Sequence, residues 1–136
     1  MKIRHLIMGA FLALAIATPA AASCVPGDEA CPAVVHMAPG ATSVLIKGEL
    51  TKARPTYYFK FTARAGQMLT IDPVKDPGIK WGAGVPITFP GGKGGDAIDP
   101  GQPFKLPSSG EYVIELLANT MADNPFGPFV VKLTIV

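Results

Sequence analysis

The clearest structural signal in the chain is the stretch Thr56-Tyr57-Tyr58-Phe59-Lys60-Phe61-Thr62-Ala63, at residues 56–63. Its aromatic residues Tyr57, Phe59 and Phe61 fall on every second position, and the more polar residues fall between them. Successive side chains of a β-strand point to opposite faces of a sheet, so this period of two places an aromatic row on a core face. The stretch therefore predicts a half-buried β-strand.

The same pattern recurs along the chain. Residues 111–118 put Tyr112, Ile114 and Leu116 on one face, and residues 129–136 alternate in the same way. Further strands are predicted at 42–50, 67–74 and, more weakly, 85–89, with short pieces at 33–37 and 104–106. Helix signals are nearly absent, because the 15 glycines and 14 prolines recur every few residues.

These strands predict an all-β domain, an antiparallel β-sandwich of about seven to eight strands. Its boundaries are expected at residues 42–136, after an N-terminal segment at 24–41. The final strand needs to pair with the sheet to be ordered. Residues 76–103 differ from the rest, because they are dense in Gly and Pro, contain the only Trp, and predict a long and little-structured connection.

The first 23 residues have the pattern of a cleavable secretory signal. Lys2 and Arg4 form a positively charged N-terminal region, and an uncharged apolar run follows it. The small residues at 20–23 suit a signal peptidase. Cleavage after Ala22 or Ser23 fits equally well. The segment predicts export to the periplasm, and no second apolar run reaches membrane length.

Cysteine usage agrees with export. Cys24 and Cys31 enclose a short loop with a Pro-Gly turn signal, and two cysteines in an oxidising compartment are expected to form a disulfide. Two alternatives stay open. Residues 21–24 loosely resemble a lipobox, which would put a lipid on Cys24 and leave Cys31 unpaired, and both cysteines could remain free thiols.

Charge and residue usage argue against several function classes. The formal charge of +2 includes Lys2 and Arg4, so the exported part is formally neutral and offers no basic stripe for nucleic acid. The glycine-rich run 91–95 contains a Lys but lacks the Ser/Thr and the helix of a P-loop. His36 is the only histidine after the signal, too little for a catalytic triad, so we predict a protein that is not an enzyme.

Metal and cofactor binding also find little support. No fourth ligand stands at a spacing typical of zinc sites relative to Cys24, Cys31 and His36. Aspartates at 72, 76, 96 and 99 match no established calcium loop, so solvated loops are the favoured interpretation. We therefore predict no metal and no cofactor.

An ordered series of segments carries a family resemblance: Lys47-Gly48-Glu49-Leu50, Tyr57-Tyr58-Phe59-Lys60-Phe61, Ala65-Gly66-Gln67, and Leu106-Pro107-Ser108-Ser109-Gly110-Glu111-Tyr112 followed by Ile114-Glu115-Leu116. The series resembles the bacterial pre-peptidase C-terminal domain, a β-sandwich of secreted proteins. It is more closely similar to the periplasmic inhibitors of g-type lysozyme. The resemblance spans about residues 42–136.

This resemblance implies a partner and a contact loop. In lysozyme inhibitors of several types, a Ser-Gly loop ending in Tyr is associated with insertion into the lysozyme cleft, and the matching positions here are Ser109, Gly110 and Tyr112. Gly110 would allow a close approach or a positive φ. Because Tyr112 shares a face with Ile114 and Leu116, a core position is the favoured interpretation of this residue, and contact with lysozyme is the alternative. The loop at 119–128 departs from the family, since it has no basic residue.

A second function class is a non-catalytic module of the cell envelope that binds polysaccharide or protein. Trp81, Tyr58 and Phe126 are aromatic residues suited to stacking on sugars if they are exposed. Sheet edges that remain exposed make a dimer an alternative to a monomer.

Overall fold

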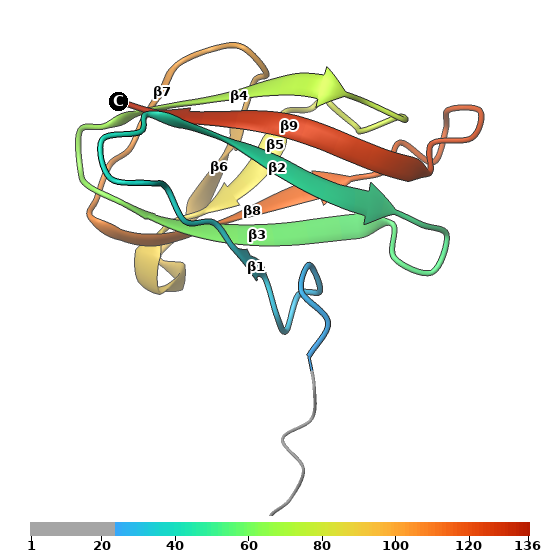
Figure 1. The fold of residues 1–136 in the computed structure, drawn as a ribbon, viewed down its shortest axis with the longest axis horizontal. Helices are drawn as coiled ribbons and strands as arrows, with labels where there is room; N and C mark the ends of the chain where they lie inside the picture. The colour runs from blue at the N-terminus through green and yellow to red at the C-terminus, as the bar shows by residue number, and fades with distance from the viewer. Residues whose placement is uncertain (1–23) are drawn as a thin grey trace, which may run out of the picture.

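A computed structural model describes residues 24–136, which form a sandwich of two β-sheets (Figure 1). The predicted export signal at 1–23 lies outside the described residues. One sheet has five strands in the order β1-β3-β8-β5-β6, and the other has four in the order β2-β9-β4-β7. The strands are β1 (Ala33–Val34), β2 (Ser43–Leu50), β3 (Thr56–Ala63), β4 (Met68–Lys75), β5 (Val85–Thr88), β6 (Gly95–Ile98), β7 (Phe104–Lys105), β8 (Gly110–Leu117) and β9 (Gly127–Ile135).

Strand β8 lies in the middle of the five-stranded sheet, with β3 beside it. They pair antiparallel with Phe59 opposite Ile114 and Phe61 opposite Tyr112. All four of these side chains are at most 3% exposed, so the alternating faces predicted from the sequence are confirmed. Their aromatic and branched side chains fill the space between the two sheets, as in other aligned sandwiches.

The C-terminal strand β9 lies in the middle of the four-stranded sheet. It pairs antiparallel with β2 on one side and β4 on the other, and its Leu133 is fully buried. At its end, Val136 N–H donates to Met68 O at 3.0 Å, and Met68 N–H donates to Val136 O at 2.7 Å. The end of the chain is thus held in the sheet.

The all-β sandwich is confirmed, with two differences from the expected arrangement. Strands β1 and β3 pair in parallel, whereas all other strand pairs of the described chain are antiparallel. The Gly/Pro-rich stretch 76–103 is more structured than its composition predicts. It contains β5, a short 3₁₀ turn η1 (Pro90–Gly92) and the unpredicted strand β6, which forms a hairpin with β5. Within residues 24–136, no helical segment has the length and hydropathy that a bilayer crossing needs.

Candidate functional site

The Ser109 turn lies on the surface between β7 and β8. Ser109 is exposed, and its Oγ accepts a hydrogen bond from Ala65 N–H at 2.9 Å. Two backbone bonds join the same loops, from Gly66 N–H to Leu106 O at 2.8 Å and from Leu106 N–H to Gln67 O at 2.9 Å. The turn before β8 and the turn between β3 and β4 therefore form one rigid unit.

Tyr112 contacts this turn from within the core. Its side chain is fully buried, so of the two alternatives left open by the sequence it takes the core position and does not offer its ring to a partner. The ring stacks on Phe61 with a centroid distance of 5.5 Å. Its hydroxyl donates to Ser108 O at 2.5 Å and accepts from Ser108 N–H at 3.1 Å. Tyr112 is thus a positioning residue for the Ser109 turn.

Gly110 joins a third loop to the first two. Its φ of +141° lies in a region that favours glycine, and an added Cβ would lie 2.7 Å from Cβ of Pro90 in η1. Both reasons for a glycine that the sequence suggested, a positive φ and a close approach, apply at this position. Any larger residue would push the η1 loop away from the Ser109 turn.

These three loops carry only positive charge. We call residues 64–67, 90–95 and 104–110 the Ser109 end; they contain the exposed cations Arg64, Lys93 and Lys105 and no acidic residue. Two acids stand directly beside these ranges in the sequence. Glu111 Oε1 lies 3.6 Å from Lys60 Nζ in an ion pair, and Asp96 is exposed. A surface with three exposed cations on joined loops and an exposed hydroxyl is suited to an acidic partner.

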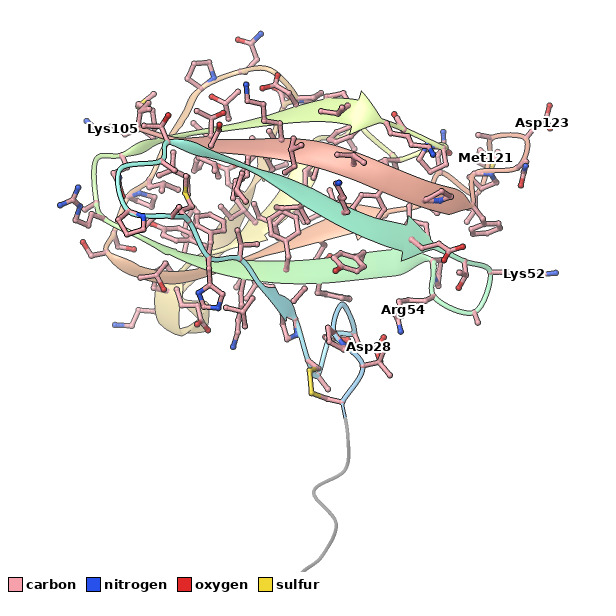
Figure 2. The ribbon with its side chains drawn as sticks, viewed as in Figure 1. Asp28, Lys52, Arg54, Lys105, Met121 and Asp123 are labelled. Carbon is pink, nitrogen blue, oxygen red and sulfur yellow. A yellow bond between two sulfur atoms is a disulfide. The ribbon has the colours of Figure 1, made fainter. Side chains whose placement is uncertain are left out.

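The loop between β8 and β9 lies at the opposite end of the sandwich. Figure 2 shows Met121 and Asp123 of this loop at one end of the sandwich, which also carries Lys52, and Lys105 at the other end. Met121 is 93% exposed, and the loop is anchored by Asn119 N–H donating to Gly78 O at 2.7 Å. The Ser-Gly turn and the loop that is basic in the resembled family therefore face away from each other, and a single contact surface at one end cannot include both.

The three aromatic residues considered for glycan stacking do not form one platform. Trp81 and Phe126 are half-buried against the core, on loops that meet where Gly78 approaches Pro125. The Trp81 Nε1–H donates to Asp76 Oδ2 at 2.6 Å, which fixes the ring. Tyr58 lies on the outer face of β3, opposite Glu115 of β8. Among the described residues, no aromatic ring pair involves any of the three.

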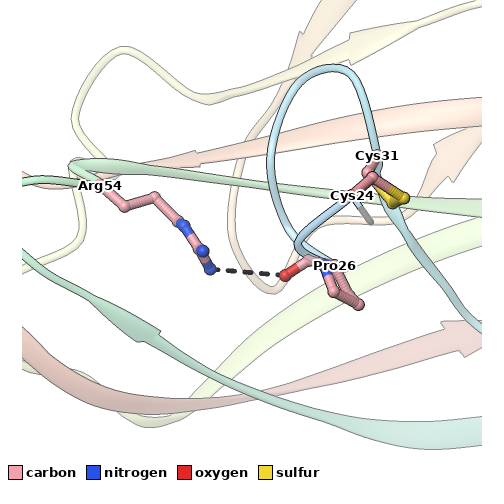
Figure 3. Close-up of a disulfide and its surroundings, with 4 residues drawn as sticks. All are labelled: Cys24, Pro26, Cys31 and Arg54. Carbon is pink, nitrogen blue, oxygen red and sulfur yellow. Dashed lines mark hydrogen bonds between the residues drawn. A yellow bond between two sulfur atoms is a disulfide. The ribbon is translucent and has the colours of Figure 1, made fainter. Parts of the chain in front are cut away.

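The N-terminal segment is closed by the predicted disulfide between Cys24 and Cys31, whose Cα atoms are 5.6 Å apart (Figure 3). Arg54 ties this small loop to the turn between β2 and β3. Its Nε lies 2.8 Å from Asp28 Oδ1, and its Nη1 donates to Pro26 O at 3.4 Å. The loop also meets β3, where Tyr58 N–H donates to Gly27 O at 2.8 Å.

The remaining candidates from the sequence are dispersed. His36 is exposed beside β1. Asp76 accepts hydrogen bonds from the N–H groups of Gly78 and Ile79, so its carboxylate closes a turn. Between residues 24 and 136, no three His, Cys, Asp or Glu side chains are grouped so as to hold a metal ion.

Sequence reasoning missed Arg64, Lys93 and Lys105. Each follows or precedes a turn signal, which marks a surface position, but nothing local indicates that the three loops meet. Their grouping depends on the β3–β8 pairing and on the contact between Gly110 and Pro90.

By its fold and site, the molecule is a small β-sandwich with a rigid, cationic, loop-built surface at one end. Solved structures share this fold. One is a periplasmic lysozyme inhibitor of g-type lysozyme, PliG, from Salmonella Typhimurium, with a TM-score of 0.60 and 19% identity. Another is a mutant of the corresponding Escherichia coli protein, with a TM-score of 0.57 and 17% identity. Each match covers 76% of this chain and 96% of the inhibitor.

The predicted resemblance to the g-type lysozyme inhibitors is thereby confirmed at the level of the fold. The likeness to the pre-peptidase C-terminal domain stays a prediction. No protein-family model matches the sequence, and no curated protein matches it either.

Proposed function

We propose that this chain is a periplasmic inhibitor of g-type lysozyme that binds in the enzyme's active-site cleft through the Ser109 end. The observation that carries the proposal is the rigid Ser109 turn, which is flanked by three cations on three joined loops. The inhibitor acts by blocking the cleft and needs no chemistry of its own, in line with the prediction that the chain is not an enzyme.

Charge and hydrogen bonding explain how this surface would suit such a cleft. Glycoside hydrolases cleave their substrates with carboxyl groups in the cleft. The Ser109 hydroxyl accepts its bond from Ala65, so its own hydrogen is left to donate to a carboxylate. Arg64, Lys93 and Lys105 are exposed on the Ser109 loop and on the two loops joined to it, and they favour an acidic partner.

The rigidity of the Ser109 end lowers the cost of binding. The turn is held by Tyr112 from inside the core, by Ala65 from one neighbouring loop and by packing of Gly110 on Pro90 from the other. A loop that is already ordered loses little conformational entropy when it enters a cleft.

The shared fold supports the same proposal. The two similar solved structures are described as periplasmic inhibitors of g-type lysozyme, and the sandwich of this chain covers nearly all of each. The export signal predicted at residues 1–23 and the Cys24–Cys31 disulfide fit a periplasmic location.

The test is a muramidase assay in which the mature protein is titrated against g-type, c-type and i-type lysozymes on peptidoglycan. We expect saturable inhibition of the g-type enzyme only. If the protein inhibited none of the three types, or inhibited c-type enzyme equally well, the proposal would fail.

A single-residue variant tests the surface. Ser109→Ala removes the proposed donor to a cleft carboxylate, and we expect inhibition to weaken about tenfold or more, because hydrogen bonds to charged groups contribute about 1.5–3 kcal/mol. Thr120→Ala removes an exposed hydroxyl at the opposite end and should leave inhibition unchanged. Equal inhibition by wild type and Ser109→Ala would exclude this contact.

A further inference from the structure

Four strands end the two sheets, and only one of them is long. Strands β1 and β7 have 2 residues each and β6 has 4, whereas β2 runs for 8 residues. Strand β2 contains no Pro, and its register with β9 runs from Ser43 to Leu50 without a bulge. Prolines, bulges and charged side chains protect long edges in natural proteins, since an open edge pairs readily with another strand. Of these devices, β2 has only the charged Lys47 and Glu49.

The backbone of β2 offers hydrogen-bonding groups to solvent. Ile135 N–H donates to Thr42 O at 2.8 Å, so the even-numbered residues of β2 bond to β9. Hydrogen-bonded and non-hydrogen-bonded pairs alternate in an antiparallel ladder, and the N–H and C=O groups of Leu45, Lys47 and Glu49 therefore point to the free edge.

Open space follows this edge along its length. Between β1 and β2 lies a cavity of about 220 Å³ lined by Val34, Val44 and Leu45. Further along, a cavity of about 640 Å³ is lined by Gly48, Glu49 and the N-terminal loop. Leu45 is 52% exposed and Val34 is 55% exposed, which leaves apolar surface uncovered beside the edge. The N-terminal segment flanks these cavities, and Leu45, Lys47 and Glu49 remain exposed to solvent along the edge.

We propose that β2 pairs antiparallel with β2 of a second copy of this chain, about a two-fold axis at Gly48. The charges of Lys47 and Glu49 favour a second copy of β2 as the pairing strand, and they also favour one register of the pairing. Centred on Gly48, the pairing places Lys47 opposite Glu49 of the second copy, and Glu49 opposite its Lys47. A register centred on Lys47 would place the two lysines against each other, which is unfavourable.

The proposed pairing also satisfies the exposed backbone. In this register, Lys47 and Glu49 of the two copies face each other in hydrogen-bonded pairs, so each facing pair exchanges two N–H···O bonds. The two-fold symmetry is the usual one for homodimers. The dimer uses the side of the sandwich and leaves the Ser109 end free, so it does not depend on the proposed inhibition of lysozyme.

Sedimentation equilibrium of the mature, disulfide-bonded protein tests this proposal in the absence of any lysozyme. We expect a concentration-dependent dimer. Lys47→Glu places like charges opposite each other twice and should weaken the dimer by about tenfold. Glu49→Lys should act in the same way. The double variant Lys47→Glu/Glu49→Lys restores both opposite-charge pairs, and we expect its dimer constant to return close to that of the wild type.

A control variant separates this edge from a general effect of charge. Lys75→Glu changes the same charge on β4, away from the free edge, and should leave the dimer constant unchanged. Circular dichroism of each variant verifies folding. A wild-type protein that is monomeric at all concentrations would overturn the proposal, and so would a double variant no better than the single ones.

Discussion

Tyr112 illustrates how a single buried side chain can shape a surface. Its ring belongs to the core, while its hydroxyl makes two hydrogen bonds with Ser108, four residues earlier. The alternation of β8 predicted the core position, because Tyr112 is in phase with Ile114 and Leu116. The bonds to Ser108 were not predictable, since they depend on how the chain turns before the strand begins.

We predict that Tyr112→Phe weakens the turn while keeping the core filled. The change leaves the Ser108 N–H and C=O groups without their partner and should cost about 1–2 kcal/mol of unfolding free energy. Denaturant unfolding monitored by circular dichroism measures this loss. As a control, Tyr58→Phe removes a half-exposed hydroxyl that makes no hydrogen bond within residues 24–136 and should be nearly neutral. Equal stability of Tyr112→Phe and wild type would contradict the positioning role.

A second residue-scale prediction concerns Glu115 on the outer face of β8. Partial burial raises the pKa of Glu115 above its ordinary value of 4.5, and the nearby Glu29 raises the pKa further. A carboxyl with a higher pKa in the folded state binds more protons when folded, so its effect on stability becomes less favourable as pH rises through this range.

Glu115→Gln should therefore be more stable than wild type at neutral pH, by less than about 1 kcal/mol because the carboxyl is still partly solvated. The difference should shrink as the pH falls and vanish below about pH 3, where Glu115 is protonated in both the folded and the unfolded protein. Unfolding free energies measured across this range check the sign. Asp123→Asn, in an exposed loop, serves as the control. A Glu115→Gln variant that is less stable than wild type at neutral pH would contradict the argument.

At the scale of elements, the strands with a long alternation of buried and exposed residues were the ones that the sequence predicted best. Strands β3, β8 and β9 are each at least 8 residues long and alternate throughout, so their faces were evident. Strand β6 has only 4 residues and buries only Ile98, because it is an edge strand with glycine and aspartate. So short a segment carries no readable period, and its pairing with β5 is decided by the hairpin between them.

The N-terminal loop is an element whose stability depends on its covalent closure. Gly27 packs so closely on Tyr57 that an added Cβ would lie 2.4 Å from the ring, and the Cys24–Cys31 disulfide keeps the loop in this shape. We predict that the mature protein has an intact mass lower than its reduced form by two hydrogens. We also predict that reduction lowers the unfolding free energy by about 2–3 kcal/mol.

Mass spectrometry before and after reduction, combined with denaturant unfolding, checks both statements. Arg64→Ala, which is far from the loop, should leave the effect of reduction unchanged. A mass that shows an acylated Cys24 would contradict the disulfide and support the lipoprotein alternative instead.

At the scale of the whole molecule, residues 24–136 are formally neutral but have an uneven distribution of charge. The Ser109 end holds three exposed cations and is bordered by Asp96 and Glu111, whereas the opposite end mixes Lys52, Asp123 and the Arg54–Asp28 pair. Composition alone argued against a basic surface. The asymmetry arises only when the fold brings three separate loops together, which is why it could not be predicted from the sequence.

This asymmetry leads to a prediction about the rate of binding to g-type lysozyme. Charges near an interface mainly govern association, so Lys93→Glu/Lys105→Glu should slow association by about tenfold at low salt, with little change in dissociation. Added salt should slow the wild type as well, because exposed charges are screened beyond about 8 Å at physiological ionic strength. The double variant should show little or reversed dependence on salt. Stopped-flow or surface plasmon resonance measurements at two salt concentrations provide both rates.

Lys52→Glu is the matched control, because it reverses an exposed lysine at the other end of the sandwich (Figure 2). It should associate at close to the wild-type rate, slightly slower only through the change in net charge. If Lys52→Glu slowed association more than the double variant, the end near Met121 would be the one that meets the enzyme, and the Ser109 turn would have a structural role only. A comparison of these two variants therefore decides which end of the sandwich enters the cleft.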